Sequence, residues 1–71
     1  MTPIRFTLRH NAATFDWELV EDSGARASMH YLTRHAACID VARDAQVMRQ
    51  GATVRIHGAD GGYEAERRFA A

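Results

Sequence analysis

Five short stretches of the chain alternate apolar and polar side chains, the period-two pattern of a strand that buries one face. They cover residues 4–9, 14–20, 25–31, 52–57 and 63–69. The first three follow one another through short polar connections, which favours an antiparallel meander. In the second stretch the pattern predicts that Phe15, Trp17 and Leu19 point toward the core. In the last, Arg67 interrupts the apolar face and indicates an edge strand.

Between the third and fourth stretches the apolar spacing changes to three and four residues, which is typical of an amphipathic helix. The apolar positions are Ala37, Cys38, Val41, Ala42, Ala45 and Met48. Thr33 is a suitable N-cap, because its hydroxyl can accept a hydrogen bond from a free backbone N–H. Gly51 is the expected left-handed residue that ends the helix. The many alanines let the helix approach the sheet closely.

These elements predict an α+β fold in the order β-β-β-α-β-β, with a mostly antiparallel sheet packed on one helix. A chain of 71 residues is long enough for a single domain, residues 1–71. The aromatic residues are spread along the chain, as one shared core requires: Phe6, Phe15, Trp17, Tyr31, Tyr63 and Phe69. One helix covers only one face of such a sheet. The other face is then either polar and solvated or buried in an oligomer.

The formal net charge is zero, since nine arginines balance nine acidic residues. This balance argues against a protein whose main task is to neutralise phosphates, although it leaves room for a local basic patch. Cys38 is the only cysteine and has no disulfide partner within the chain. A small domain without disulfides, and without a signal-peptide pattern at its first residues, is expected to be soluble and cytoplasmic.

The stretch from Trp17 to Phe69 resembles a family of small bacterial proteins catalogued as domain of unknown function 2188. The resemblance rests on a tryptophan in an early strand (FDWELV), the helix sequence TRHAACIDVARDA, the glycine after it, and the strand and turn VRIHGADGG. It implies a β-rich fold with one helix. It implies no activity, ligand or catalytic residue.

Three groups of residues suggest chemistry, and a structural explanation is favoured for each. His35 and Cys38 have the spacing of metal ligands on a helix, but Cys38 also falls on the apolar stripe, where a thiol packs as a small hydrophobe. His57 is a candidate base with Asp60 nearby, yet aspartates in turns commonly accept backbone N–H groups. The glycine-rich run 58–62 is expected to form a hairpin turn rather than a phosphate loop. We therefore expect no cofactor and no metal site.

Basic side chains are predicted on the solvent face of the first three strands: Arg5, Arg9, Arg26 and His30. A sheet backed by a helix can present such side chains to a nucleic acid. Asp16 and Glu18 are predicted on the same face, and with Glu21 and Asp22 they form an acidic cluster that would repel phosphates.

The sequence favours a small non-enzymatic interaction or accessory module that self-associates, most simply as a homodimer, through the sheet face that the helix leaves uncovered. The alternative is a nucleic-acid-binding domain that uses the arginine-bearing face. No membrane partner is expected.

Overall fold

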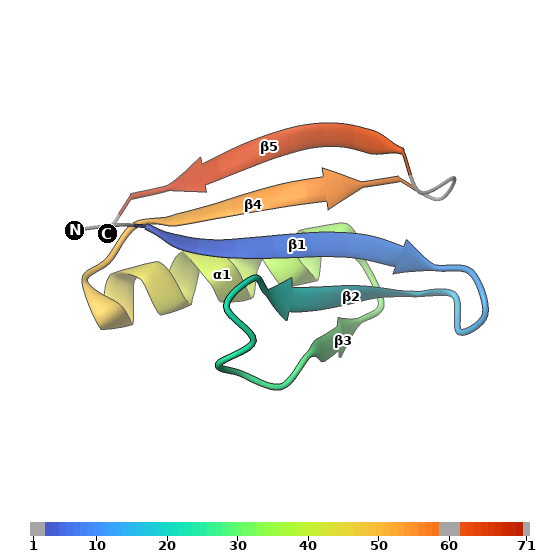
Figure 1. The fold of residues 1–71 in the computed structure, drawn as a ribbon, viewed down its shortest axis with the longest axis horizontal. Helices are drawn as coiled ribbons and strands as arrows, with labels where there is room; N and C mark the ends of the chain where they lie inside the picture. Colours follow the sequence, from blue (N-terminus) through green and yellow to red (C-terminus); the bar gives the residue numbers. More distant parts are fainter. Residues whose placement is uncertain (1–2, 59–61, 71) are drawn as a thin grey trace.

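The computed structural model describes residues 3–58 and 62–70, which form one sheet with a helix on one side (Figure 1). In chain order the elements are β1 (Ile4–Asn11), β2 (Asp16–Glu21), β3 (Met29–Tyr31), α1 (Arg34–Met48), β4 (Ala52–His57) and β5 (Tyr63–Phe69). The predicted α+β class and the order β-β-β-α-β-β are confirmed.

The sheet has the strand order β3-β2-β1-β4-β5, which places β1 at its centre. Three of the neighbouring pairs are antiparallel: β1 with β2, β2 with β3, and β4 with β5. The pair β1 and β4 is parallel, with Phe6 opposite Val54 and Leu8 opposite Ile56. Parallel strands need a long crossover connection. Here that connection contains α1, and it places β4 between β1 and β5.

The core lies between α1 and the face of the sheet toward which the apolar residues of β1, β2 and β4 point. The buried residues are Phe6, Leu8, Leu19, Ala37, Cys38, Val41, Ala45, Ala52, Val54 and Ile56. Among the described residues no polar or charged side chain is buried with them. The helix contributes mainly small side chains, so its backbone lies close to the larger residues of the sheet.

The helix begins as predicted but ends differently. The Thr33 hydroxyl accepts a hydrogen bond from the Ala36 backbone N–H at 3.1 Å. At the other end Arg49, and not Gly51, adopts the left-handed conformation, with φ 52°. The N–H of Gln50 donates to the Ala45 carbonyl at 3.1 Å, which closes the last turn two residues earlier than expected.

The hairpin between β1 and β2 corrects the prediction for Phe15. The two strands pair up to Asn11 and Asp16, so residues 12–15 form the connecting loop. Asn11 accepts a hydrogen bond from the Ala13 N–H at 3.0 Å, which favours the turn. Phe15 lies at the end of this loop with φ 56° and is 80% exposed, outside the core.

The third strand is shorter than the alternation over 25–31 predicted, because only Met29–Tyr31 pairs with β2. Its apolar alternation is weak, with alanine at two of the four inward positions. Tyr63 is also exposed, at the start of β5. Within residues 3–58 and 62–70 no helix is both long and apolar enough to cross a membrane.

Candidate functional site

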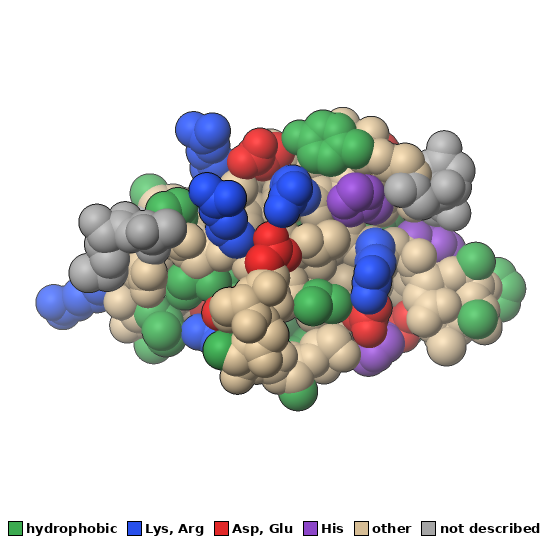
Figure 2. Space-filling model, viewed as in Figure 1, with side chains coloured by type: hydrophobic (Ala, Val, Ile, Leu, Met, Phe, Trp, Pro, Cys, Tyr) green, Lys and Arg blue, Asp and Glu red, His purple; other side chains and the backbone are tan. Residues whose placement is uncertain are grey.

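The face of the sheet turned away from α1 is polar. Strand pairing and alternation place the following side chains on it: Arg5, Thr7, Arg9, Asn11, Asp16, Glu18, Val20, His30, Thr53, Arg55, His57, Tyr63, Glu66 and Arg68. Figure 2 shows this face with arginines and acidic side chains interspersed over its surface. We call it the open face. It carries both signs of charge, and Tyr63 is the exposed large apolar side chain that strand pairing places on it, so in its described part it differs from the faces that proteins commonly bury in stable dimers.

Two of the basic residues predicted for the open face are paired with acidic neighbours. Arg9 forms an ion pair with Glu18 at 3.0 Å. His30 Nδ1 lies 3.0 Å from a carboxylate oxygen of Asp16. Arg5 also lies on the open face and forms no ion pair with another described residue.

The carboxyl of Asp16 is favoured in its charged form. The Thr14 hydroxyl donates a hydrogen bond to it, and this contact is the largest cause that lowers the pKa of Asp16 below its usual value. The neighbouring His30 adds a second, electrostatic contribution in the same direction. The negative charge at this end of the open face therefore persists at neutral pH.

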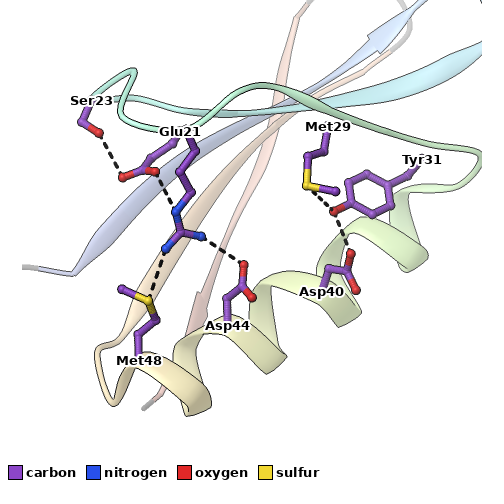
Figure 3. A network of polar contacts seen from close by, with 8 residues as sticks. Glu21, Ser23, Met29, Tyr31, Asp40, Asp44 and Met48 are labelled. Atoms are coloured by element: carbon purple, nitrogen blue, oxygen red, sulfur yellow. Dashed lines mark hydrogen bonds and ion pairs between the residues drawn. The ribbon is translucent and has the colours of Figure 1, made fainter.

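Arg26 does not lie on the open face, contrary to the prediction. It belongs to the loop that replaces the first half of the expected third strand, and this loop crosses to the helix side. Its guanidinium forms ion pairs with Glu21 and Asp44, both at 3.2 Å, and donates to the Met48 sulfur at 3.4 Å (Figure 3). Arg26 therefore holds residues 22–28 against α1.

A second contact fixes β3 to the helix. The phenol of Tyr31 donates a 2.8 Å hydrogen bond to Asp40 of α1 (Figure 3). Partial burial, followed by the bond to this carboxylate, raises the pKa of Tyr31 to about 12. The short strand at this edge of the sheet is thus tied to the helix, although Met29 and His30 are exposed.

Two arginines that the sequence did not single out complete the open face. Thr53 of β4 lies opposite Arg5 on one side and Arg68 on the other, so the three form one row across three strands. Arg55 lies in the next row and pairs with Asp22 at 3.0 Å. The alternation within β4 and β5 predicts on which face of the sheet Arg55 and Arg68 lie. Their position near Arg5 follows only from the parallel pairing of β1 with β4.

A shallow hollow of about 740 Å³ surrounds this row near the ends of the chain. Its polar lining includes Arg5, Thr53, Arg55, Glu66 and Arg68. Arg68, like Arg5, forms no ion pair with another described residue. The hollow is the most basic part of the open face.

The opposite edge of the sheet, formed by β5, is exposed along its length. Six of its seven residues are exposed, and Phe69 is half-buried. Ala65, Arg67 and Phe69 lie opposite buried residues of β4 and therefore share the helix side, whereas Glu66 and Arg68 share the open face. Figure 1 shows that α1 lies behind β1 and β2, to the side of β5. The helix thus leaves most of this edge strand exposed, and Arg34 of α1 reaches it through an ion pair with Glu64 at 3.4 Å.

The other residues that the sequence suggested for chemistry, as far as the structure describes them, are Cys38, His35 and His57, and they lie in different surroundings. Cys38 is buried in the core as expected, whereas His35 is exposed. No cluster of three or more potential metal ligands occurs in the described part of the chain. The ring of His57 contacts Tyr63 edge-on at 6.0 Å. Asp60 and the centre of the predicted glycine-rich turn lie outside the described residues, and at its ends Gly58 N–H donates to the Gly62 carbonyl at 2.9 Å.

Comparison with known proteins gives one match. No curated protein and no solved structure matches the chain. A family model described as an uncharacterized protein conserved in bacteria (DUF2188) matches residues 9–69, which include every element of the fold except the first part of β1. The chain therefore belongs to this small bacterial family, domain of unknown function 2188.

Proposed function

We propose that the chain is a small non-enzymatic interaction module whose binding element is the edge of β5. The observation that carries this proposal is the exposure of six of the seven residues of an edge strand. An edge strand presents unpaired backbone N–H and C=O groups, which can pair with a strand of another molecule. Backbone pairing supplies affinity, and the side chains of the edge supply specificity.

The two edges of the sheet differ in a way that supports this choice. The β3 edge is only three residues long, and Tyr31 ties it to the helix through Asp40. Short edges are a common protection against unwanted pairing. The β5 edge has seven residues, and it contacts α1 and the core through an exposed ion pair of Glu64 with Arg34 and through Phe69. Its exposure therefore fits a strand that pairs with a partner.

The open face supports binding less well than the sequence suggested. Self-association through this face would bury several ion-paired charges, among them Arg9 with Glu18 and Arg55 with Asp22. Removing such pairs from water costs free energy that only excellent geometry offsets. The edge of the sheet therefore suits the contact better than its open face. The buried free thiol of Cys38 is compatible with a reducing compartment, and we place the module in the cytoplasm.

The proposal is tested by capturing partners with the tagged protein and with two charge-reversed variants. Arg68→Glu changes the β5 edge, and Arg43→Glu makes the same change on the exposed side of α1. Partners that pair with β5 are expected to bind wild type and Arg43→Glu but to be lost from Arg68→Glu. If Arg68→Glu retains every partner and the wild-type protein is monomeric, the proposal is wrong.

A second candidate function, nucleic-acid binding, is favoured by one observation: Arg5 and Arg68 flank Thr53 in the basic hollow without ion-pair partners among the described residues. Arginine suits phosphate because its planar guanidinium can donate two parallel hydrogen bonds. This candidate predicts binding to single- or double-stranded nucleic acid that weakens steeply with salt and is lost in an Arg5→Ala, Arg68→Ala double variant. Equal binding by the double variant would contradict it.

A further inference from the structure

We infer that the strand that pairs with β5 is β5 of a second copy of this chain, aligned antiparallel with Arg67 on the two-fold axis. This inference rests on the proposed role of the β5 edge and names its partner. In such a pair each residue lies opposite a residue on the same face of the joined sheet. The alignments of β5 with a second β5 can therefore be compared by the pairs of residues that each alignment places opposite each other.

The alignment centred on Arg67 places unlike charges together. On the open face Glu66 of each copy lies opposite Arg68 of the other, which gives two symmetric ion pairs. Neither side chain forms an ion pair with another described residue within one copy. Cross-strand pairs of opposite charge stabilise a sheet, whereas like charges destabilise it.

The same alignment matches apolar residues on the helix side. Ala65 of each copy lies opposite Phe69 of the other. Ala65 is exposed in a single copy although it lies opposite the buried Ile56 on the sheet. Phe69 is already packed at the margin of the core. Pairing therefore extends the apolar face by one residue on each side of the axis.

Neighbouring alignments are worse. A shift that centres the pair on Glu66 places the two Glu66 carboxylates opposite each other and leaves Arg67 opposite Ala65. It also places Arg68 opposite Glu64, but Glu64 already forms an ion pair with Arg34 at 3.4 Å. A shift that centres it on Arg68 places two arginines together on the open face and pairs Glu66 with Ala70. Of these three alignments, only the one on Arg67 pairs Glu66 with Arg68, the two charges of β5 on the open face that form no ion pair with another described residue.

In this alignment Arg67 of one copy lies opposite Arg67 of the other at the axis, and the two positive charges repel each other. The position of the Arg67 side chain in one copy reduces this repulsion. Its guanidinium lies over the ring of Phe69, 5.7 Å from the centroid. The side chain thus runs along the strand, away from the axis. In an antiparallel pair the two guanidinium groups then point in opposite directions, each over its own aromatic ring, where the contact is favourable.

The two-fold axis would run perpendicular to the sheet and join two five-stranded sheets into one. Both helices would then lie on the same side, each behind its own β1 and β2, apart from the junction (Figure 1). A single strand junction is smaller than the roughly 1,200 Å² that stable interfaces bury. The dimer is therefore expected to be weak and to depend on concentration.

Charge reversal tests the pairing. Glu66→Arg and Arg68→Glu each replace two attractive pairs by two repulsive ones and are expected to weaken dimerisation at least about tenfold in sedimentation experiments. The double variant Glu66→Arg, Arg68→Glu restores unlike pairs and is expected to regain the wild-type dissociation constant. Circular dichroism checks that each variant folds, and Arg43→Glu is the matched control. Failure of the double variant to recover would overturn the pairing.

Cysteine substitution tests the alignment. Arg67→Cys places two thiols opposite each other at the axis, within the range that a disulfide spans, and is expected to cross-link at least about ten times faster than Glu66→Cys. Both positions are exposed, so exposure alone gives equal rates. Equal rates, faster cross-linking of Glu66→Cys, or a wild-type protein that stays monomeric would each overturn the inference. The proposed function survives that result if Arg68→Glu still loses a captured partner.

Discussion

Glu66 and Arg68 lie two residues apart on the open face of the edge strand β5, and neither forms an ion pair with another described residue. Charged residues on an edge strand commonly prevent edge-to-edge pairing. A set of one sign would repel a second copy. This pair has both signs, and in an antiparallel alignment each residue lies opposite its complement.

Self-association is expected to weaken as the salt concentration rises. The ion pairs between copies would be exposed, and exposed charges are screened within about 10 Å at 0.1 M salt. Sedimentation at increasing sodium chloride is therefore expected to give a rising dissociation constant for the wild-type protein. The variant in which Glu66 and Arg68 are exchanged should show the same trend. A dimer that strengthens with salt would indicate an apolar contact elsewhere, for example at the exposed Val47 of α1.

Phe15 is expected to be a destabilising residue in the folded monomer. It adopts φ 56° at the end of the hairpin loop and is 80% exposed, so the cost of its left-handed conformation is offset by little packing. Asn tolerates this conformation better than Phe. We expect Phe15→Asn to raise the free energy of unfolding in urea by about 0.5–1 kcal/mol.

Phe15→Leu is the control for that experiment, because it removes the aromatic ring without favouring the left-handed conformation. Its free energy of unfolding should stay within about 0.5 kcal/mol of wild type, as for most surface substitutions. If Phe15→Asn lowers stability instead, the ring contributes packing that the structure does not show, and Phe15 would become a candidate contact residue.

The bond between Tyr31 and Asp40 predicts a loss of stability at high pH. The pKa of Tyr31 is raised to about 12 in the folded state, above the ordinary value of 10.0. The contribution of this group is therefore fully present below pH 10 and is lost as the pH rises toward 12. Absorbance titration of the phenol, compared with Tyr31→Phe, gives the folded pKa. Asp40→Asn should lower that pKa; an unchanged value would show that burial alone raises it.

The strands and the helix could be predicted from periodicity because each has one buried face. Ile4, Phe6 and Leu8 alternate strictly, and Thr33 marks the start of the helix. The predictions failed where local patterns compete with turn geometry. Phe15 continues an apolar alternation, but the hairpin loop already begins at residue 12. Arg49 ends the helix in a conformation that glycine more often adopts, so the sequence pointed to Gly51.

The candidate surfaces were harder to predict because they depend on which strands are neighbours. Alternation places Arg5 and Arg68 outward, yet nothing local indicates that Thr53 lies between them. The alternation over residues 25–31 predicts a strand with Arg26 on the open face, whereas the bonds of Arg26 to Glu21 and Asp44 depend on the position of α1. The exposure of β5 likewise follows from the lateral position of the helix, which is a property of the packed structure.

Hydrogen–deuterium exchange of the backbone amides, measured at low and high protein concentration, tests the central claim most directly. If β5 pairs with another copy, its amides should exchange more slowly at high concentration, while the amides of the β3 edge keep the same rates. The Arg68→Glu variant should show no such difference. Exchange along β5 that is independent of concentration, in a protein that also captures no partner through Arg68, would contradict the role of this edge.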